Sequence, residues 1–282
     1  MFNRALLLVT GKGGVGKSAV AAAAALHAAK QGRRVLLIGM TDAAGLAAHL
    51  RVGRLGTEPA RVRPGLHALA IDPAAALDEY LRLRIKVPRL GIMTRAFGVL
   101  ADTVPGIRDT IVIGKVVYEA TRPEWDLVVA DAPPTGQILS YLRAPATIQA
   151  LVPGGRVREQ AAWMRGVLSD PAVTGLLAVA TPEELPVAET RETLDAMTDE
   201  ALTKVAGVVA NRVVPPLAIP QNRIDAEPPG PRRDAAELHR DVRHAQEAHL
   251  AALQPDVTFP LFFGLRTPGE VASRLSEMWE GS

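Results

Sequence analysis

Short runs of apolar residues recur along the chain and alternate with longer segments of helical periodicity. The runs cover residues 6–10, 35–40, 66–71, 127–131, 175–180, 205–210 and 257–261. Continuous apolar runs of this length are typical of strands that are buried on both faces, and such strands form parallel sheets covered by helices. The pattern therefore predicts a doubly wound α/β fold with a mostly parallel sheet of about seven strands flanked by helices.

Three segments depart from this simple alternation. Residues 73–122 and 141–172 are helical in pattern but too long for one crossover helix, so we expect a small helical subdomain inserted into a single domain over residues 1–282. The segment from Pro215 to Pro231 contains six prolines, which predicts a loop that joins neither the sheet nor a helix. A helical pattern then runs from Asp234 to Leu253.

A glycine-rich segment directly follows the first apolar run. Residues 11–18 are Gly-Lys-Gly-Gly-Val-Gly-Lys-Ser, which satisfies the spacing of a P-loop between a strand and a helix. In such a loop the backbone N–H groups and the helix N-terminus converge on phosphate oxygens, so the sequence predicts that ATP and Mg²⁺ are the cofactors. Lys17 would reach the β- and γ-phosphates, and Ser18 would ligate Mg²⁺. The remaining predicted nucleotide-binding positions are Gly11, Gly13, Gly14, Val15, Gly16 and Ala19.

Lys12 is the unusual member of this loop, because an ordinary P-loop does not require a lysine directly after its first glycine. Taken alone, Lys12 can be a solvated loop residue. With Lys12, however, the loop resembles the deviant Walker A motif of the family that contains the nitrogenase iron protein and the Min, Par and arsenite-transporter ATPases. In that family the early lysine crosses a dimer interface to the partner's nucleotide. The resemblance therefore implies a homodimer in which Lys12 is catalytic in trans.

Residues 41–44 are Thr-Asp-Ala-Ala and follow the second apolar run. They resemble the Thr-Asp-Pro-Ala of the first switch in the arsenite-pump and tail-anchored-protein-targeting branch of the family. The resemblance implies that Asp42 is catalytic and orients the attacking water, although Ala43 replaces the proline of that motif. An alternative is that Asp42 caps a helix over residues 43–50.

The apolar run 127–131 ends in an acid, and the chain continues as Asp-Ala-Pro-Pro-Thr-Gly from Asp131. A carboxylate at the end of a strand beside the P-loop can hold Mg²⁺ as a Walker B acid does. The Asp-x-x-Pro-Thr-Gly pattern resembles the second switch of the arsenite-pump branch, and this resemblance implies that Gly136 offers its backbone near the γ-phosphate. The alternative is that Asp131 only caps the Pro-Pro turn.

Two later positions match the adenine end of the site in the same branch. Asn211 follows the run 205–210, and Phe259-Pro260-Leu261 resembles the Val-Pro-Leu of that branch. The resemblance implies that Asn211 recognises adenine and that the loop beginning at Pro260 packs on the base.

Composition limits the partners. The formal charge of +2 does not by itself suggest a nucleic-acid or membrane partner, so we do not expect nucleic acid to bind, and the absence of Cys leaves no thiolate zinc site and no obvious arsenite site. No segment reaches the length and hydrophobicity of a membrane span, so we expect a cytoplasmic location. One stretch can still form a basic surface for lipid, nucleic acid or an acidic partner, or simply a solvated helix face: Arg82, Arg84, Lys86, Arg89 and Arg95.

These observations predict a Mg-ATP-dependent ATPase that switches with nucleotide as a homodimer, or as a dimer with a paralogue. Its nucleotide state would control the binding of a protein client or a membrane partner, neither of which the sequence identifies. The alternative is a Min- or Par-like positioning ATPase, or a nucleotide-dependent scaffold with slow turnover.

Overall fold

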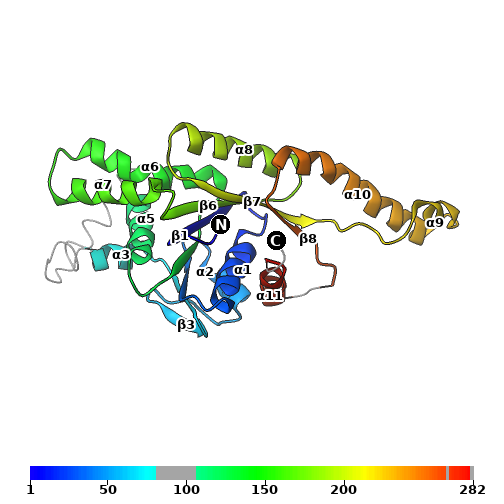
Figure 1. Cartoon of the computed structure of the whole chain (residues 1–282), viewed down its shortest axis with the longest axis horizontal. Coiled ribbons are helices and arrows are strands. Elements are labelled where there is room, and N and C mark those ends of the chain that lie inside the picture. The colour runs from blue at the N-terminus through cyan, green and yellow to red at the C-terminus, as the bar shows by residue number, and fades with distance from the viewer. Residues whose placement is uncertain (81–105, 265–266, 280–282) are drawn as a thin grey trace.

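A single central sheet organises the structure, a computed structural model that describes residues 1–80, 106–264 and 267–279 (Figure 1). Within these residues the sheet has eight strands in the order β3-β4-β2-β5-β1-β6-β7-β8. Neighbouring strands pair in parallel except β3 and β4. The strands are β1 Leu6–Gly11, β2 Val35–Gly39, β3 Ala60–Arg63, β4 Leu66–Ala70, β5 Leu127–Asp131, β6 Thr174–Ala180, β7 Val205–Val213 and β8 Val257–Pro260. The doubly wound α/β fold is confirmed.

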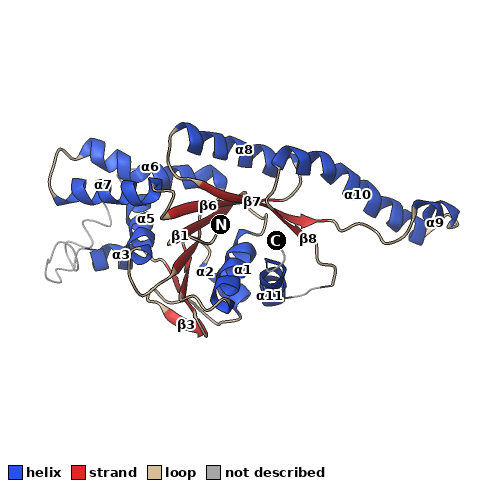
Figure 2. Cartoon of the chain, viewed as in Figure 1, coloured by secondary structure: helices blue, strands red, loops and turns tan. Residues whose placement is uncertain are grey.

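Helices cover both faces of the sheet (Figure 2). Because successive strand residues point to opposite faces, Leu7 and Val9 pack into one core while Leu6 and Leu8 pack into the other. The first core is completed by α1 Lys17–Lys30, α2 Ala43–Leu50 and α11 Pro268–Met278. The second is completed by α5 Ile107–Ala120, α6 Thr135–Leu151, α7 Arg156–Ser169, α8 Glu184–Asp199 and the end of α10 Pro231–Leu253. This arrangement buries the middle strands on both faces.

The edge strand β3 was not predicted from the sequence. Its residues, Ala-Arg-Val-Arg, are mostly exposed, and it pairs antiparallel with β4. An edge strand with charged residues lacks the continuous apolar run that marks the buried strands. The sheet therefore has one more strand than the apolar pattern indicates.

The intervals 73–122 and 141–172 contain helices where the structure describes them. The first includes α3 Pro73–Tyr80 and α5, and the second includes α7 and most of α6, which begins ahead of it at Thr135. The basic stretch from Arg82 to Arg95 lies outside the described residues. None of the helices in the described ranges is long and apolar enough to cross a bilayer.

The prediction that Pro215 to Pro231 joins no helix was wrong. The segment contains α9 Gln221–Ala226, and Pro231 is the first residue of α10. Pro220 and Pro231 stand at or just before a helix start, where the missing N–H of proline costs nothing because no intrahelical acceptor is available there. In Figure 1, α10 leads away from the sheet to α9 at the far end of the molecule.

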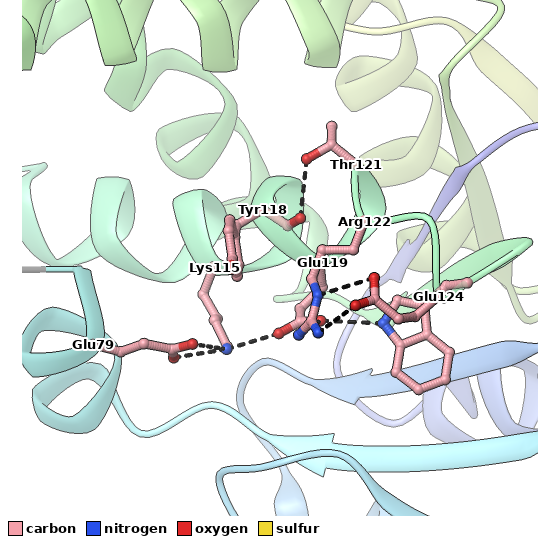
Figure 3. Close-up of polar contacts among 8 residues, drawn as sticks. Glu79, Lys115, Tyr118, Glu119, Thr121, Arg122 and Glu124 are labelled. Carbon is pink, nitrogen blue, oxygen red and sulfur yellow. Dashed lines mark hydrogen bonds and ion pairs between the residues drawn. The ribbon is translucent and has the colours of Figure 1, made fainter. Parts of the chain in front are cut away.

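A buried ion network holds α5 against α3 (Figure 3). Glu119 is 0% exposed and accepts hydrogen bonds from Lys115 at 2.8 Å, Arg122 at 3.3 Å and the Trp125 indole at 3.1 Å. Lys115 also donates to Glu79 of α3 at 2.7 Å. Desolvation lowers the pKa of Lys115, but the hydrogen bonds to Glu119 and Glu79 outweigh it, so the pKa is raised. Each buried charge in this network thus has a partner of opposite sign.

Candidate active site

The loop of residues 11–16 joins β1 to α1 at the carboxyl edge of the sheet. Gly16 has φ 91°, and an added Cβ would lie 2.4 Å from Asn211 Nδ2. At Gly11 an added Cβ would lie 2.0 Å from the carbonyl oxygen of Val179 on β6. Both positions therefore require glycine. The first turn of α1, all of it described, carries no acidic residue, which leaves its partial positive charge free for an anion.

The other predicted loop residues differ in exposure. Gly13 and Gly14 lie in open space, whereas Val15 and Ala19 are 2% and 5% exposed. The side chains of Val15 and Ala19 belong to the core, so a phosphate at this loop would meet only their backbone. The sequence prediction for these positions concerns backbone donors, and their contact with phosphate stays a prediction.

Ser18 and Asp131 are brought together by the sheet order. Asp131 ends β5, which pairs with β1, and Ser18 lies in the first turn of α1. The Ser18 hydroxyl donates to Asp131 Oδ2 at 2.6 Å. Asp131 is 2% exposed, and its Oδ1 has no hydrogen-bond partner within the described part of the chain.

Burial raises the pKa of Asp131 from 3.8 to about 6, and the charge of Asp42 adds to this rise. The Ser18 hydrogen bond and the Lys17 ammonium oppose it. A hydroxyl paired with a buried carboxylate whose second oxygen lacks a partner is a donor set suited to a hard divalent cation. The residues therefore fit Mg²⁺.

Lys17 and Asp42 lie near this pair. Burial lowers the pKa of Lys17, and the charges of Asp131 and Asp42 act in the opposite direction. The Lys17 ammonium donates to the carbonyl oxygen of Lys12 at 3.4 Å. An ammonium that is penalised by burial gains from a bound anion, as the phosphate role predicted for Lys17 requires.

Asp42 is the N-cap of α2, since its Oδ1 accepts from the backbone N–H of Gly45 at 2.8 Å. The capping role considered for Asp42 therefore exists in the structure. It does not exclude a role toward water, because the same carboxylate acts electrostatically on Lys17 and Asp131.

The second switch begins at the end of β5. Pro133 accepts a hydrogen bond from the Thr10 hydroxyl at 2.6 Å, which ties this loop to β1. Thr135 begins α6, and the next residue, Gly136, is exposed with open space around its Cα. The backbone of Gly136 is therefore accessible at the start of a helix.

At the other side of the loop, Asn211 donates from Nδ2 to the carbonyl oxygen of Val15 at 2.8 Å and is 4% exposed. It lies within β7, which continues to Val213. Pro260 ends β8 and pairs with Val213. The structure thus brings Asn211 to the base of the P-loop and sets Pro260 on the adjacent strand.

Comparison with known proteins agrees with this geometry. The family described as anion-transporting ATPase matches residues 4–155. ATPase BagA of Mycobacterium tuberculosis is 36% identical over 231 residues, which is 77% of this chain and 67% of that protein. The chain belongs to the anion-transporting ATPase family. It is accordingly an ATP hydrolase.

Other similar proteins are longer. The arsenical pump-driving ATPase of Acidiphilium multivorum is 31% identical over 232 residues, which is 74% of this chain and 39% of that protein. An arsenical pump-driving ATPase of Escherichia coli is 30% identical over 210 residues, covering 66% of this chain and 36% of the relative. This ATPase thus matches well under half the length of those two proteins.

The remaining site lysine of the ATPase has a partner that the sequence did not reveal. Lys12 forms an ion pair with Glu189 of α8, and Glu189 Oε2 also accepts from the Thr135 hydroxyl at 3.3 Å. Glu189 lies shortly after the Thr-Pro-Glu-Glu segment that begins at Thr181. That proximity in sequence gives no indication of which helix face meets the P-loop, so reasoning from the sequence missed this residue.

Proposed function

We propose that this ATPase binds ATP with Mg²⁺ at the P-loop and hydrolyses it as a dimer, either a homodimer or a dimer with a paralogue. Its nucleotide state would control the binding of a protein client or a membrane partner. The observation that carries the nucleotide site is the Ser18–Asp131 pair: Asp131 Oδ1 has no partner among the described residues, and the charge of Asp131 acts on a desolvated Lys17. A buried carboxylate oxygen and a partly buried ammonium are stabilised together when Mg²⁺ and phosphate both bind.

Each residue then has a defined task. Ser18 and Asp131 would hold Mg²⁺, which supplies positive charge to the β- and γ-phosphates, while Lys17 contacts the same phosphates. The backbone N–H groups at the start of α1 complete the phosphate cradle. Asp42 orients the attacking water, and the exposed backbone of Gly136 is available to the γ-phosphate region. Asn211 and Pro260 form the adenine end.

The two loop lysines support the dimer part of the proposal. Lys17 interacts with Asp131 and Asp42, whereas Lys12 pairs with Glu189 on another helix. Because Lys17 already serves the subunit's own phosphates, a second cation contributes most by stabilising transition-state charge on the partner's nucleotide. Arsenite itself is not the proposed substrate, because the chain has no Cys to bind it.

One observation favours the alternative of a scaffold with slow turnover. The Asp42 carboxylate is engaged as the cap of α2, and no hydrogen bond between described residues holds it toward the P-loop. Asp42→Asn separates the two roles, because asparagine caps a helix about as well as aspartate but is a poor acceptor for a proton from water. Turnover reduced at least ~100-fold with retained ATP binding supports catalysis. Wild-type turnover in this variant supports the scaffold.

Mixing variants tests the dimer. Lys12→Ala protein and Asp42→Asn protein should each be nearly inactive, since removal of a cation supplied in trans costs roughly 10³-fold or more in rate. In a heterodimer, the Lys12→Ala subunit keeps Asp42 and receives Lys12 from its partner. Random mixing should restore about one quarter of the wild-type turnover, because heterodimers are half of the dimers and each has one competent site. Activity that stays at the single-variant level, in a mixture shown to contain heterodimers, would contradict the trans role.

A further inference from the structure

Glu189 lies where three parallel strands end side by side. β1 is flanked by β5 and β6, and its last residue, Gly11, pairs with Val179 near the end of β6. The loop after β1 supplies Lys12, the loop after β5 leads to Thr135, and α8, which follows β6, supplies Glu189. A single carboxylate on α8 therefore reaches both the P-loop and the start of the second switch helix.

The contacts divide between the two oxygens of this carboxylate. Oε1 pairs with the Lys12 ammonium, and Oε2 accepts from the Thr135 hydroxyl at 3.3 Å. Thr135 is 2% exposed, so its hydroxyl has a fixed position, whereas the side chains of Lys12 and Glu189 are 30% and 40% exposed. A partly exposed ion pair is weak, so a modest change at the nucleotide site is enough to break it.

We propose that Glu189 is a positioning residue that keeps Lys12 within its own subunit in the nucleotide-free ATPase. Through Thr135, the release of Lys12 is linked to movement of the second switch. The inference rests on the trans role of Lys12 given under Proposed function, because Lys12 must leave Glu189 to reach a partner's nucleotide. Glu189 itself touches no reacting atom.

Chemical labelling of Lys12 tests the restraint without nucleotide. Nucleotide-free protein is treated with a limiting amount of an amine-acylating reagent, and the labelled fraction of Lys12 is measured by peptide mass spectrometry. Glu189→Gln should raise Lys12 labelling about two- to fivefold, the range that corresponds to a partly exposed ion pair. Glu192→Gln, which removes an exposed carboxylate from the same helix, is the matched control and should leave Lys12 labelling unchanged. Equal labelling of Lys12 in wild type and Glu189→Gln would overturn the proposal.

Thr135 tests the link to the switch. Thr135→Val removes the hydroxyl that orients Glu189 and should raise Lys12 labelling, while Thr135→Ser keeps the hydroxyl and should not. Wild-type labelling of Lys12 in Thr135→Val would overturn the coupling between Lys12 and the second switch.

Turnover gives a second readout. With Lys12 released, Glu189→Gln should increase ATP turnover about two- to fivefold at low protein concentration, and adding Lys12→Ala should abolish the gain. Reduced turnover in Glu189→Gln would overturn the proposal, because Glu189 would then be required to present Lys12. If Glu189→Gln increases labelling but wild-type turnover does not depend on Lys12, the trans role fails while the restraint by Glu189 stands.

Discussion

Asp131 and Glu119 are both almost completely removed from solvent, but their oxygens are satisfied differently. Both oxygens of Glu119 have partners, since Oε1 accepts from Lys115 and Oε2 from Arg122 and Trp125 (Figure 3). Asp131 has one partner, the Ser18 hydroxyl at Oδ2, while Oδ1 has none within the described residues. Glu119 lies in the last turn of α5, directly before β5, and Asp131 ends β5, so the two acids flank the same strand and differ in how completely their oxygens are paired.

This difference distinguishes a buried charge that stabilises the fold from a buried charge that is available to bind a ligand. A buried ion is tolerated when opposite charges and hydrogen bonds surround it, and removing one member leaves the others unpaired. A buried carboxylate with one unpartnered oxygen instead lowers the stability of the folded protein until a cation binds to that oxygen. The pKa of Asp131, raised to about 6 by burial, expresses this cost. Burial alone therefore does not mark a functional acid.

The largest expected effect is on the dependence of turnover on Mg²⁺. Asp131→Asn keeps an acceptor for Ser18 but loses the charge that would hold the cation. The Mg²⁺ concentration for half-maximal ATP hydrolysis should rise about 10- to 100-fold, as for loss of a group that supports a metal ligand set. Glu119→Gln is the control and should change the Mg²⁺ concentration for half-maximal hydrolysis by no more than about twofold. Steady-state turnover over a Mg²⁺ titration measures both, and an equal response of the two variants would remove the distinction between the sites.

The next largest effect is on stability. Glu119→Gln leaves Lys115 and Arg122 short of a buried negative charge, so the free energy of unfolding should fall by about 3 to 5 kcal/mol. Denaturant unfolding at neutral pH measures it. Glu124 binds the same Arg122 from the exposed side, so Glu124→Gln is a matched control that should lose far less. If Glu119→Gln lowers the free energy of unfolding no more than Glu124→Gln does, the network does not stabilise the fold.

The fold was largely predictable because its strongest features are local in sequence. Continuous apolar runs mark strands buried on both faces, and each of these predicted strands is present. The exceptions carry weak local signals. β3 is an exposed edge strand with two arginines, and α9 is a short helix whose preceding Pro220 was counted against helical structure. In both cases the position of the segment in the fold outweighed the residue composition on which the prediction relied.

The site was predictable where function follows from loop chemistry and not where it depends on long-range contacts. Ser18 and Asp131 are far apart in sequence, yet the motif spacing and the sheet edge were enough to place them together. Glu189 meets Lys12 only because α8 follows β6, which pairs with β1, and no local pattern specifies that contact. Glu119 was missed for a different reason: its partners lie within six residues of it, but no local pattern shows that this carboxylate is buried.

The smallest expected effect is the pH dependence that burial imposes on Asp131. The pKa of this acid rises from 3.8 to about 6 in the folded protein, so the native state binds the proton more tightly than the unfolded chain does. The stability from this proton is fully present below pH 4 and is lost as pH rises through about 6. The shift corresponds to at most about 3 kcal/mol.

Unfolding of nucleotide-free wild type and Asp131→Asn between pH 4 and 7.5 isolates this effect, because asparagine has no proton to lose. The two proteins should be similar in stability near pH 4, and the variant should become the more stable one as pH rises through about 6. Asp126 supplies a control of opposite sign, since the hydrogen bonds from Arg34 lower its pKa to about 2. The advantage of wild type over Asp126→Asn should therefore stay nearly constant over this pH range, because it is lost only as pH falls below 4 toward about 2. A stability difference between wild type and Asp131→Asn that does not change with pH would mean that Asp131 tolerates its charge without a cation, as Glu119 does with its partners.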